Sequence, residues 1–267
     1  MKIAFSKYQG TGNDFVMIDN RANFFPKENN KLIEHLCNRR FGIGGDGLIL
    51  LENDLETNFK MVYFNSDGNQ STMCGNGGRC LVAFAKKLEI IENKATFIAV
   101  DGLHHATINE NDIVSLQMQD ITEIKIEPDF VFLNTGSPHH VTMVENLHIY
   151  NVKENGSRIR NSELYGKAGS NINFVTQMND SEFTIRTFER GVEDETLSCG
   201  TGATATAIAM HATHKTASNI IKINVEGGKL EISFTKWENN YVSIFLTGQA
   251  EFVFDGKIDI ETIYNKT

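Results

Sequence analysis

Two segments of this chain share one pattern, Phe64-Asn-Ser-Asp-Gly-Asn-Gln-Ser-Thr-Met-Cys74-Gly-Asn-Gly-Gly-Arg79 and Phe188-Glu-Arg-Gly-Val-Glu-Asp-Glu-Thr-Leu-Ser-Cys199-Gly-Thr-Gly-Ala203. Each leads from an alternating apolar stretch through an acidic loop to Cys-Gly-x-Gly, and then into small residues typical of a helix. The pattern predicts a cysteine at a helix N-terminus twice, where free N–H groups and partial positive charge stabilise a thiolate. Two such cysteines indicate two proton-transfer groups, one for each face of a carbon acid.

The repeat continues beyond the cysteines at a constant offset. The two cysteines are 199 − 74 = 125 residues apart, and the strand-like segments that end at Val100 and Val225 are also 225 − 100 = 125 apart. Such self-similarity predicts a duplicated fold. We therefore expect an α+β protein with two similar, pseudo-duplicated domains, each a curled β-sheet or barrel around a central helix.

The pattern of apolar residues supports this organisation. Helices are expected over residues 27–38, 76–88 and 202–214, between many short strands rich in Val, Ile, Phe and Tyr. The third helix has small residues nearly all round, which is typical of a buried helix. We expect residues 1–118 to form an N-terminal half that carries Cys74, and residues 119–255 a C-terminal half that carries Cys199.

Composition excludes several functional classes. The chain has 267 residues, 40% of them hydrophobic and 22% charged, with a net charge of −9, which suits two globular domains. No Lys/Arg cluster stands out, so nucleic-acid binding is not expected. No apolar stretch approaches the length of a membrane span and no signal peptide is visible, so the expected location is the cytoplasm, away from the membrane.

The spacing of the four cysteines favours neither a metal site nor a disulfide framework. No two of the cysteines form a Cys-x-x-Cys pair, so we expect no metal site; they are Cys37, Cys74, Cys80 and Cys199. Without an export signal a disulfide framework is not expected either. Cys37 and Cys80 lie within helical patterns and are expected to be small buried side chains.

Residue types alone suggest a mechanism for the two remaining cysteines. One thiolate would abstract an α-hydrogen, and the other cysteine, as a thiol, would return a hydrogen to the opposite face and invert the centre. The residues after each cysteine, Gly75, Asn76, Gly200 and Thr201, expose backbone N–H groups that suit a carboxylate on which negative charge builds. A thiol pair needs no cofactor for this chemistry, so none is expected.

These motifs, taken together, resemble those of the diaminopimelate epimerase family almost from end to end. The matching elements are Gly12-Asn-Asp-Phe15, Gly42-Ile-Gly-Gly-Asp46, Phe64-Asn-Ser-Asp-Gly68, Cys74-Gly-Asn-Gly-Gly-Arg-Cys80, Gly136-Ser-Pro-His139, Asn171-Ile-Asn-Phe174, Glu189-Arg-Gly191 and Cys199-Gly-Thr-Gly202. The resemblance implies a cofactor-free epimerase with two catalytic thiols, Cys74 and Cys199, in two similar domains. It also implies that the last segment, about residues 256–267, returns to the N-terminal domain.

The resemblance further assigns roles by position. It implies that Asn13, Asn65 and Asn171 bind the substrate together with Glu189 and Arg190, and that Arg190 pairs with a distal carboxylate. His139 and Glu189 correspond to residues that tune the cysteines. The family is commonly homodimeric, and residues 247–256 resemble its pairing strand, so a homodimer acting on diaminopimelate is expected.

Two positions depart from the family pattern, and rival functions remain open. Gly47 stands where many members have Gln, and Ser137 where many have Asn. A proline racemase, a hydroxyproline epimerase or another amino-acid racemase would use the same paired-cysteine chemistry. From a different class, a non-catalytic redox sensor would form a disulfide between the two cysteines.

Overall fold

The computed structural model describes residues 1–261, and the chain divides into two compact units. Unit 1 comprises Met1–Leu116 together with the C-terminal stretch that begins at Gln249, and unit 2 comprises Gln117–Gly248. The division falls two residues before the expected boundary after residue 118. The return to unit 1 begins 256 − 249 = 7 residues earlier than expected. Residues 262–267, the end of the expected returning segment, lie outside the described residues.

Unit 1 contains two helices among its strands. In chain order its elements are β1 (Lys2–Gly10), β2 (Asn13–Asp19), α1 (Asn30–Cys37), β3 (Gly47–Glu52), β4 (Phe59–Asn65), α2 (Gly75–Lys87), β5 (Lys94–Ala99), β6 (Gly102–Ile108), β7 (Ile113–Gln117) and, from the end of the chain, β17 (Glu251–Asp259).

Unit 2 follows a closely similar order. Its elements are β8 (Ile124–Ile126), β9 (Val131–Asn134), β10 (Pro138–Met143), the short 3-10 helix η1 (Leu147–Ile149), α3 (Val152–Arg160), β11 (Asn171–Asn179), β12 (Glu182–Glu189), β13 (Asp194–Thr196), α4 (Gly200–Ala212), β14 (Ile220–Val225), β15 (Gly228–Trp237) and β16 (Asn240–Gln249).

Strand pairing repeats between the two units. In unit 1, β1 is antiparallel to β2, β2 is parallel to β3, β3 is antiparallel to β4, β4 is parallel to β5, and β5 is antiparallel to β6. In unit 2, strands β9, β10, β11, β12, β14 and β15 pair in the same sequence of directions. Strand β17 then adds antiparallel to β1, and β8 adds antiparallel to β9. The predicted α+β, pseudo-duplicated fold is confirmed by this correspondence.

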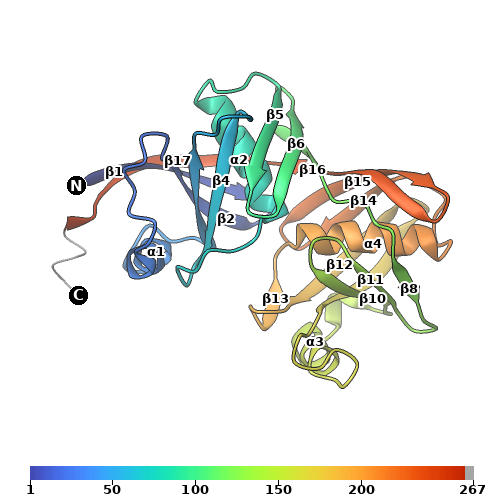
Figure 1. The fold of residues 1–267 in the computed structure, drawn as a ribbon. Helices are drawn as coiled ribbons and strands as arrows, with labels where there is room; N and C mark the ends of the chain where they lie inside the picture. The colour runs from blue at the N-terminus through green and yellow to red at the C-terminus, as the bar shows by residue number, and fades with distance from the viewer. Residues whose placement is uncertain (262–267) are drawn as a thin grey trace. The chain divides into compact units, whose positions relative to one another are not determined.

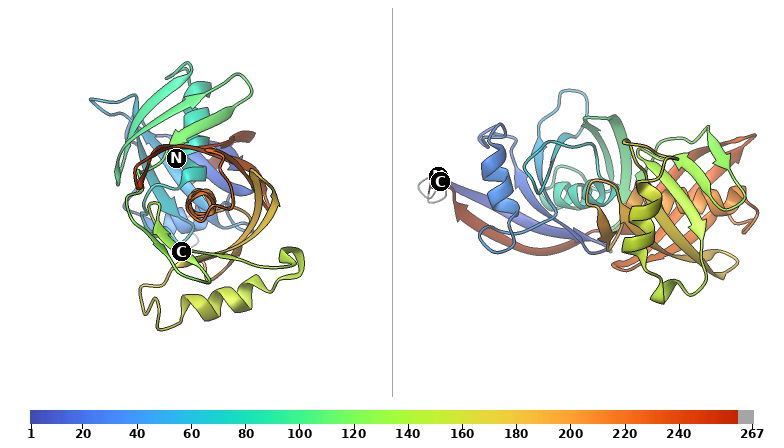
Figure 2. Two further views of the ribbon diagram at one scale, coloured as in Figure 1. Left: turned by 90° about the vertical axis from the view of Figure 1, so that its right-hand side faces the viewer. Right: turned by 90° about the horizontal axis from the view of Figure 1, so that it is seen from below.

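One helix is buried in each unit at the equivalent position (Figure 1). Helices α2 and α4 both have 13 residues, and their first residues are 200 − 75 = 125 apart. Every residue of α4 from Gly202 to Met210 is buried, as its run of Ala, Thr and Gly predicts. In the left view of Figure 2, α4 is seen nearly along its axis with strands curving around it. Small side chains let the surrounding strands approach this helix closely.

A second helix covers the opposite sheet face in each unit. In unit 1, Leu32, Ile33 and Leu36 of α1 pack with apolar residues of β1, β2, β3 and β4. In unit 2, Val152 of α3 joins Phe174 and Phe188 of the sheet in a smaller cluster. Helix α3 has no counterpart among the expected helices. Only Val152 and Gly156 of its nine residues are buried, so its sequence carries a weak apolar pattern.

Candidate active site

In unit 1, Cys74 lies at the start of the buried helix, as predicted. It is the N-cap residue of α2, with an extended backbone (φ −98°, ψ 127°), and the Gly75 and Asn76 N–H groups follow it in the first turn. The glycine-rich start lets the helix lie close to β3, because a Cβ at Gly77 would be 2.8 Å from Ile49 Cδ1. Cys74 is partly exposed whereas Cys37 and Cys80 are buried, as expected for structural cysteines.

Asn13 contacts this cysteine directly. Its Oδ1 accepts from Cys74 Sγ at 3.6 Å and from Asn76 Nδ2 at 3.3 Å. Its Nδ2 donates to Asp46 Oδ2 at 2.6 Å. Because Asp46 fixes the amide hydrogens, the amide oxygen of Asn13 is directed to the cysteine. The structure thus brings Asn13 together with Cys74 and Asn76, which lie in a separate stretch of the chain.

Asp46 belongs to a charged network that anchors the β1–β2 turn. Arg39 bridges Asp14 and Asp46, with N–O distances of 2.6 and 2.7 Å, and Lys7 pairs with Asp14 at 2.7 Å. Burial alone would raise the pKa of Asp14, but hydrogen bonds from Arg39 and Lys7 outweigh it and lower that pKa to about 2. The turn that carries Asn13 is therefore held by ionised groups at neutral pH.

Asn65 ends β4 opposite Gly47 of β3. Within residues 1–261 its side chain makes no hydrogen bond with Asn13, Cys74 or Asn76, so the structure does not join it to that group. A Cβ at Gly47 would lie 2.5 Å from Tyr63 Cε2. The departure from Gln at this position is thus accompanied by an aromatic ring that occupies the space beside Gly47.

In unit 2, Cys199 is the N-cap of α4 and is likewise extended (φ −122°, ψ 108°). Its Sγ lies 3.5 Å from Thr201 Oγ1, which lies 3.3 Å from Ser137 Oγ, which lies 3.0 Å from His139 Nε2. These side chains form a chain of contacts from the buried histidine to the sulfur. His139 is thus linked to Cys199 through Ser137 and Thr201, and the link at Ser137 is made by its hydroxyl group.

The chain of contacts has a definite direction. Asn173 Nδ2 donates to His139 Nδ1 at 3.1 Å, so Nε2 carries the ring hydrogen and donates to Ser137 Oγ. Burial, and then the positive charge of Arg190, lower the pKa of His139 to about 3, so the ring is neutral at neutral pH. Ser137 then donates to Thr201, whose hydroxyl can donate to a Cys199 thiolate or accept from its thiol.

The remaining expected site residues of unit 2 lie in and around the loops of Ser137 and Arg190. Asn171 Nδ2 donates to Ser137 Oγ and to the Pro138 carbonyl, and its Oδ1 accepts from the Arg190 backbone N–H. Asn171 therefore links the loop of Ser137 to the loop of Arg190. The Arg190 guanidinium donates to the Ala168 carbonyl. Glu189 accepts from Thr196 Oγ1 at 2.6 Å.

Sequence reasoning did not single out two residues of this arrangement. Asp46, which orients Asn13, and Asn173, which orients His139, both lie in quoted motifs but received no role. Asn173 follows Asn171 by two residues on a strand, so both side chains lie on one sheet face, and that alternation was the available signal.

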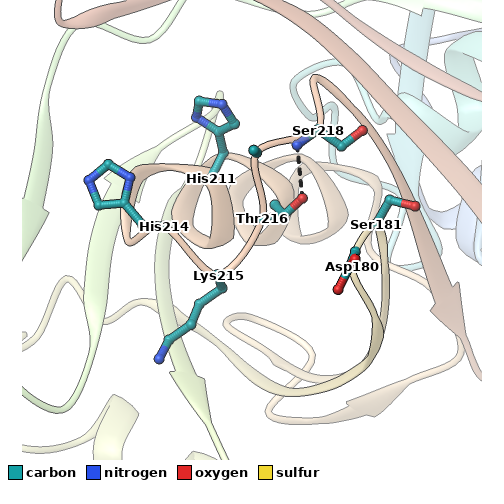
Figure 3. A pocket seen from close by; sticks show the side chains of 8 residues that line it. Asp180, Ser181, His211, His214, Lys215, Thr216 and Ser218 are labelled. Atoms are coloured by element: carbon teal, nitrogen blue, oxygen red, sulfur yellow. Dashed lines mark hydrogen bonds between the residues drawn. The ribbon is translucent and has the colours of Figure 1, made fainter.

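A hollow of about 610 Å³ lies at the other end of α4 (Figure 3), lined by His211, His214 and Lys215. Because Cys199 begins that helix and His211 is near its end, this hollow is separate from the cysteine. In residues 1–261, no group of three or more His, Cys, Asp or Glu is placed to hold a metal ion. None of the helices in the described part of the chain has the length and apolarity that crossing a membrane requires.

Solved structures with the same fold define the structural class. A Bacillus anthracis phenazine biosynthesis protein of the PhzF family aligns with a TM-score of 0.78 and 14% identity, over 97% of this chain and all (100%) of that one. A hydroxyproline epimerase from Agrobacterium vitis aligns with a TM-score of 0.72 and 14% identity, over 96% of this chain and 92% of that one. At this identity the likeness shows the fold alone, a two-unit α+β architecture.

Sequence comparison then gives the family. The profile described as "Diaminopimelate epimerase" matches residues 5–122 and 131–253. A diaminopimelate epimerase from Flavobacterium psychrophilum is 71% identical, over 94% of this chain and 98% of that protein. One from Aquifex aeolicus is 38% identical, over 97% of this chain and 99% of that protein. The chain belongs to the diaminopimelate epimerase family and is an isomerase.

Proposed function

We propose that this protein is a cofactor-independent diaminopimelate epimerase that interconverts the LL and meso forms by proton transfer between two cysteines. The observation that carries the proposal is the pair of N-cap cysteines, Cys74 on α2 and Cys199 on α4, each followed by glycine at the start of a buried helix. The family, which the high identity to a diaminopimelate epimerase establishes, supports this substrate.

The chemistry follows from the two sulfurs. A thiolate forms a new S–H bond to the α-hydrogen, and the C–H electron pair moves toward the adjacent carboxylate. The other cysteine breaks its S–H bond and delivers that proton to the opposite face, so it ends as the thiolate. Backbone N–H groups at Gly75, Asn76, Gly200 and Thr201 stabilise the carboxylate as its charge increases.

The remaining residues bind the substrate or adjust the thiols. We assign Asn13, Asn65, Asn171, Glu189 and Arg190 to the substrate, with Arg190 on the distal carboxylate because a planar guanidinium matches it in bidentate geometry. His139 and Glu189 tune the cysteines, and for His139 the route is the Ser137–Thr201 chain of contacts.

The cellular setting is also a proposal. The protein would act in the cytoplasm in the synthesis of lysine and peptidoglycan precursors. It would form a homodimer through β17, in which Phe252, Val253 and Phe254 are exposed to solvent at 42%, 50% and 45%. A mass measurement in solution, repeated with Phe254→Lys, tests this assembly; a monomeric wild type would exclude it.

Incubation with LL-diaminopimelate in deuterated water tests the activity. The product should be the meso isomer with deuterium at the inverted α-carbon. Cys74→Ala and Cys199→Ala should each lose at least about 10²-fold in turnover while staying folded, because acid–base groups contribute about 10²–10⁴-fold. Cys37→Ala, which removes a buried cysteine of the α1 core, is the matched control and should retain activity.

The same preparation separates the rival functions. Turnover of proline or hydroxyproline in preference to diaminopimelate would favour the racemase alternative. A redox sensor would give no turnover, and diamide treatment would convert the Cys74 and Cys199 thiols to a disulfide that peptide mapping detects. Wild-type discrimination against lysine, relaxed in Arg190→Ala, would support the assignment of the distal carboxylate.

A further inference from the structure

Arg79, on the helix that Cys74 begins, is fully buried and has no hydrogen-bond partner. Its side chain is 0% exposed, and all three guanidinium nitrogens, Nε, Nη1 and Nη2, have no partner among the described residues. Buried charges in proteins are normally paired, because removing an ion from water is costly. A guanidinium does not lose its proton at physiological pH, so it requires a negative counterpart.

The surroundings of Arg79 limit what that counterpart can be. Its Nη2 and the Sγ of Cys80 both lie 3.3 Å from where a Cβ at Gly10 would be, and the Asn76 carbonyl lies 3.5 Å from that point. Gly10 pairs with Asn13 across the β1–β2 turn, and Asn13 contacts Cys74 and Asn76. Arg79 is therefore packed under the same turn that orients the catalytic cysteine.

Other acidic groups around α2 are already neutral or paired. Tyr8 has a raised pKa through burial, and Asp14 is paired with Lys7 and Arg39. Asp255 is paired with Lys87, and Asp112 with Lys86. The strands that pack against α2 carry further titratable and charged groups: Lys2, Lys7 and Tyr8 on β1, Asp14 and Asp19 on β2, Glu52 on β3, Lys60 and Tyr63 on β4, His104 and His105 on β6, and Glu251, Asp255, Lys257 and Asp259 on β17.

The two thiols near Arg79 differ in their capacity to carry charge. Burial raises the pKa of Cys80 to about 12, so it stays a thiol. Cys74 is partly exposed and begins the helix, where the helix dipole favours a thiolate. Burial lowers the pKa of Arg79, whereas negative charge on Cys80 or on Cys74 raises it.

Unit 2 has no such cation at the equivalent place. Five residues after Cys199, as Arg79 is five after Cys74, lies Thr204, which is buried and donates to the Gly200 carbonyl. The Thr201 and Ser137 hydroxyls link Cys199 to a neutral His139. Arg190, whose positive charge lowers the pKa of His139, is exposed and donates to the Ala168 carbonyl.

We propose that Arg79 is the counter-charge of the Cys74 thiolate, so that the substrate-free enzyme carries its thiolate on Cys74 and its thiol on Cys199. Arg79 is then a positioning residue that acts through Cys74 and touches no substrate. This inference rests on the proposed function, and it adds which cysteine is the base in the first half of a catalytic cycle.

Alkylation of the substrate-free protein by iodoacetamide, followed for each cysteine by peptide mass spectrometry across pH, tests the proposal. The quantity compared is the pH at which alkylation of each cysteine is half-maximal. The alkylation rates themselves are not compared, because Cys199 is more buried than Cys74 and so reacts more slowly at equal thiolate content. Cys74 should have the lower midpoint in the wild type. A lower midpoint for Cys199 would overturn the proposal, and this comparison stands even if an Arg79 variant does not fold.

Variants test whether Arg79 is the residue that lowers the alkylation midpoint of Cys74. Arg79→Met should raise the Cys74 midpoint by at least one pH unit, equivalent to about a tenfold loss of reactivity at neutral pH, and leave Cys199 unchanged. Arg79→Lys, which keeps the charge, should restore most of the reactivity. Cys80→Ala should leave the Cys74 midpoint unchanged. An unshifted Cys74 in folded Arg79→Met, or a shift caused by Cys80→Ala, would refute the role of Arg79.

The deuterium-incorporation assay on the same wild-type protein keeps the two ideas separate. Epimerisation with the thiolate on Cys199 would overturn this inference and leave the proposed function intact. A protein that shows the expected midpoints but no epimerisation would refute the proposed function, and the assignment of a catalytic base would fail with it.

Discussion

Substitution of the equivalent glycine in the two buried helices should destabilise the protein at one position and be nearly neutral at the other. Gly202 in α4 and Gly77 in α2 are 202 − 77 = 125 residues apart and occupy the same helical position. An added Cβ at Gly202 would lie 2.4 Å from Asn173 Oδ1, and 3.3 Å from Cys199 Cβ and Sγ. At Gly77 the nearest atom, at 2.8 Å, is Cδ1 of Ile49, the flexible end of a side chain.

The expected magnitude follows from what holds Asn173 in place. Its buried amide donates to the His140 carbonyl and the His139 ring and accepts from Thr187, at 3.0 to 3.1 Å. Overpacking costs about 1–3 kcal/mol, and loss of one such hydrogen bond about 1–3 kcal/mol. Replacing glycine by alanine within a helix stabilises the protein by about 1 kcal/mol. Gly202→Ala should therefore lose about 3 kcal/mol, and Gly77→Ala should change stability by less than about 1 kcal/mol.

Urea unfolding measures the difference. Trp237, the single tryptophan of the sequence, lies in unit 2, so its fluorescence follows the affected unit. Gly202→Ala should also lower kcat/KM by at least about tenfold, since small displacements of reacting groups are costly to catalysis. Equal urea midpoints for Gly202→Ala and the wild type, with full activity, would refute the close packing of Asn173 against α4.

Three further outcomes are expected. Ser137→Ala should break the link from His139 to Thr201 and lower kcat about tenfold with little change in stability, and its kcat–pH profile should differ from the wild type; an unchanged profile would show that the link is not used. Asp46→Asn should leave the amide of Asn13 without a fixed orientation and raise KM more than it lowers kcat, as steady-state kinetics would show; unaltered kinetics would contradict this role. Stability should fall as the pH is lowered from about 6.5 toward 3, because the unfolded chain binds a proton at His139 that the folded protein, with a pKa of about 3, does not; urea midpoints that stay constant over this range would contradict the buried neutral ring.

The parts of the fold that depend on local pattern were predictable from the sequence. The starts of α2 and α4 were expected within two residues, because a glycine pair after a cysteine and a run of small residues mark a helix N-terminus locally. The duplication was visible as a constant offset of 125 residues. Helix α3 was missed because it buries only Val152 and Gly156, so it lacks an apolar stripe.

Contacts between distant residues were not predictable in this way. Asn13 and Cys74 are 74 − 13 = 61 residues apart, and only the strand pairing that follows from the complete fold brings them together. The resemblance to a family assigned Asn13 a role but did not show that Asp46 orients it. The burial of Arg79 could not be predicted either, because arginine is almost never fully buried without a partner.

Duplication and divergence contribute differently to the proposed chemistry. The shared strand order gives each cysteine the same backbone setting, at the N-cap of a 13-residue buried helix. Divergence then gives them different neighbours, since Arg79 in one copy corresponds to Thr204 in the other, and Asn76 corresponds to Thr201. A two-cysteine epimerisation begins and ends with one thiolate and one thiol. Two identical environments would leave the location of that single negative charge undetermined, whereas a buried cation in only one copy assigns it before the substrate binds.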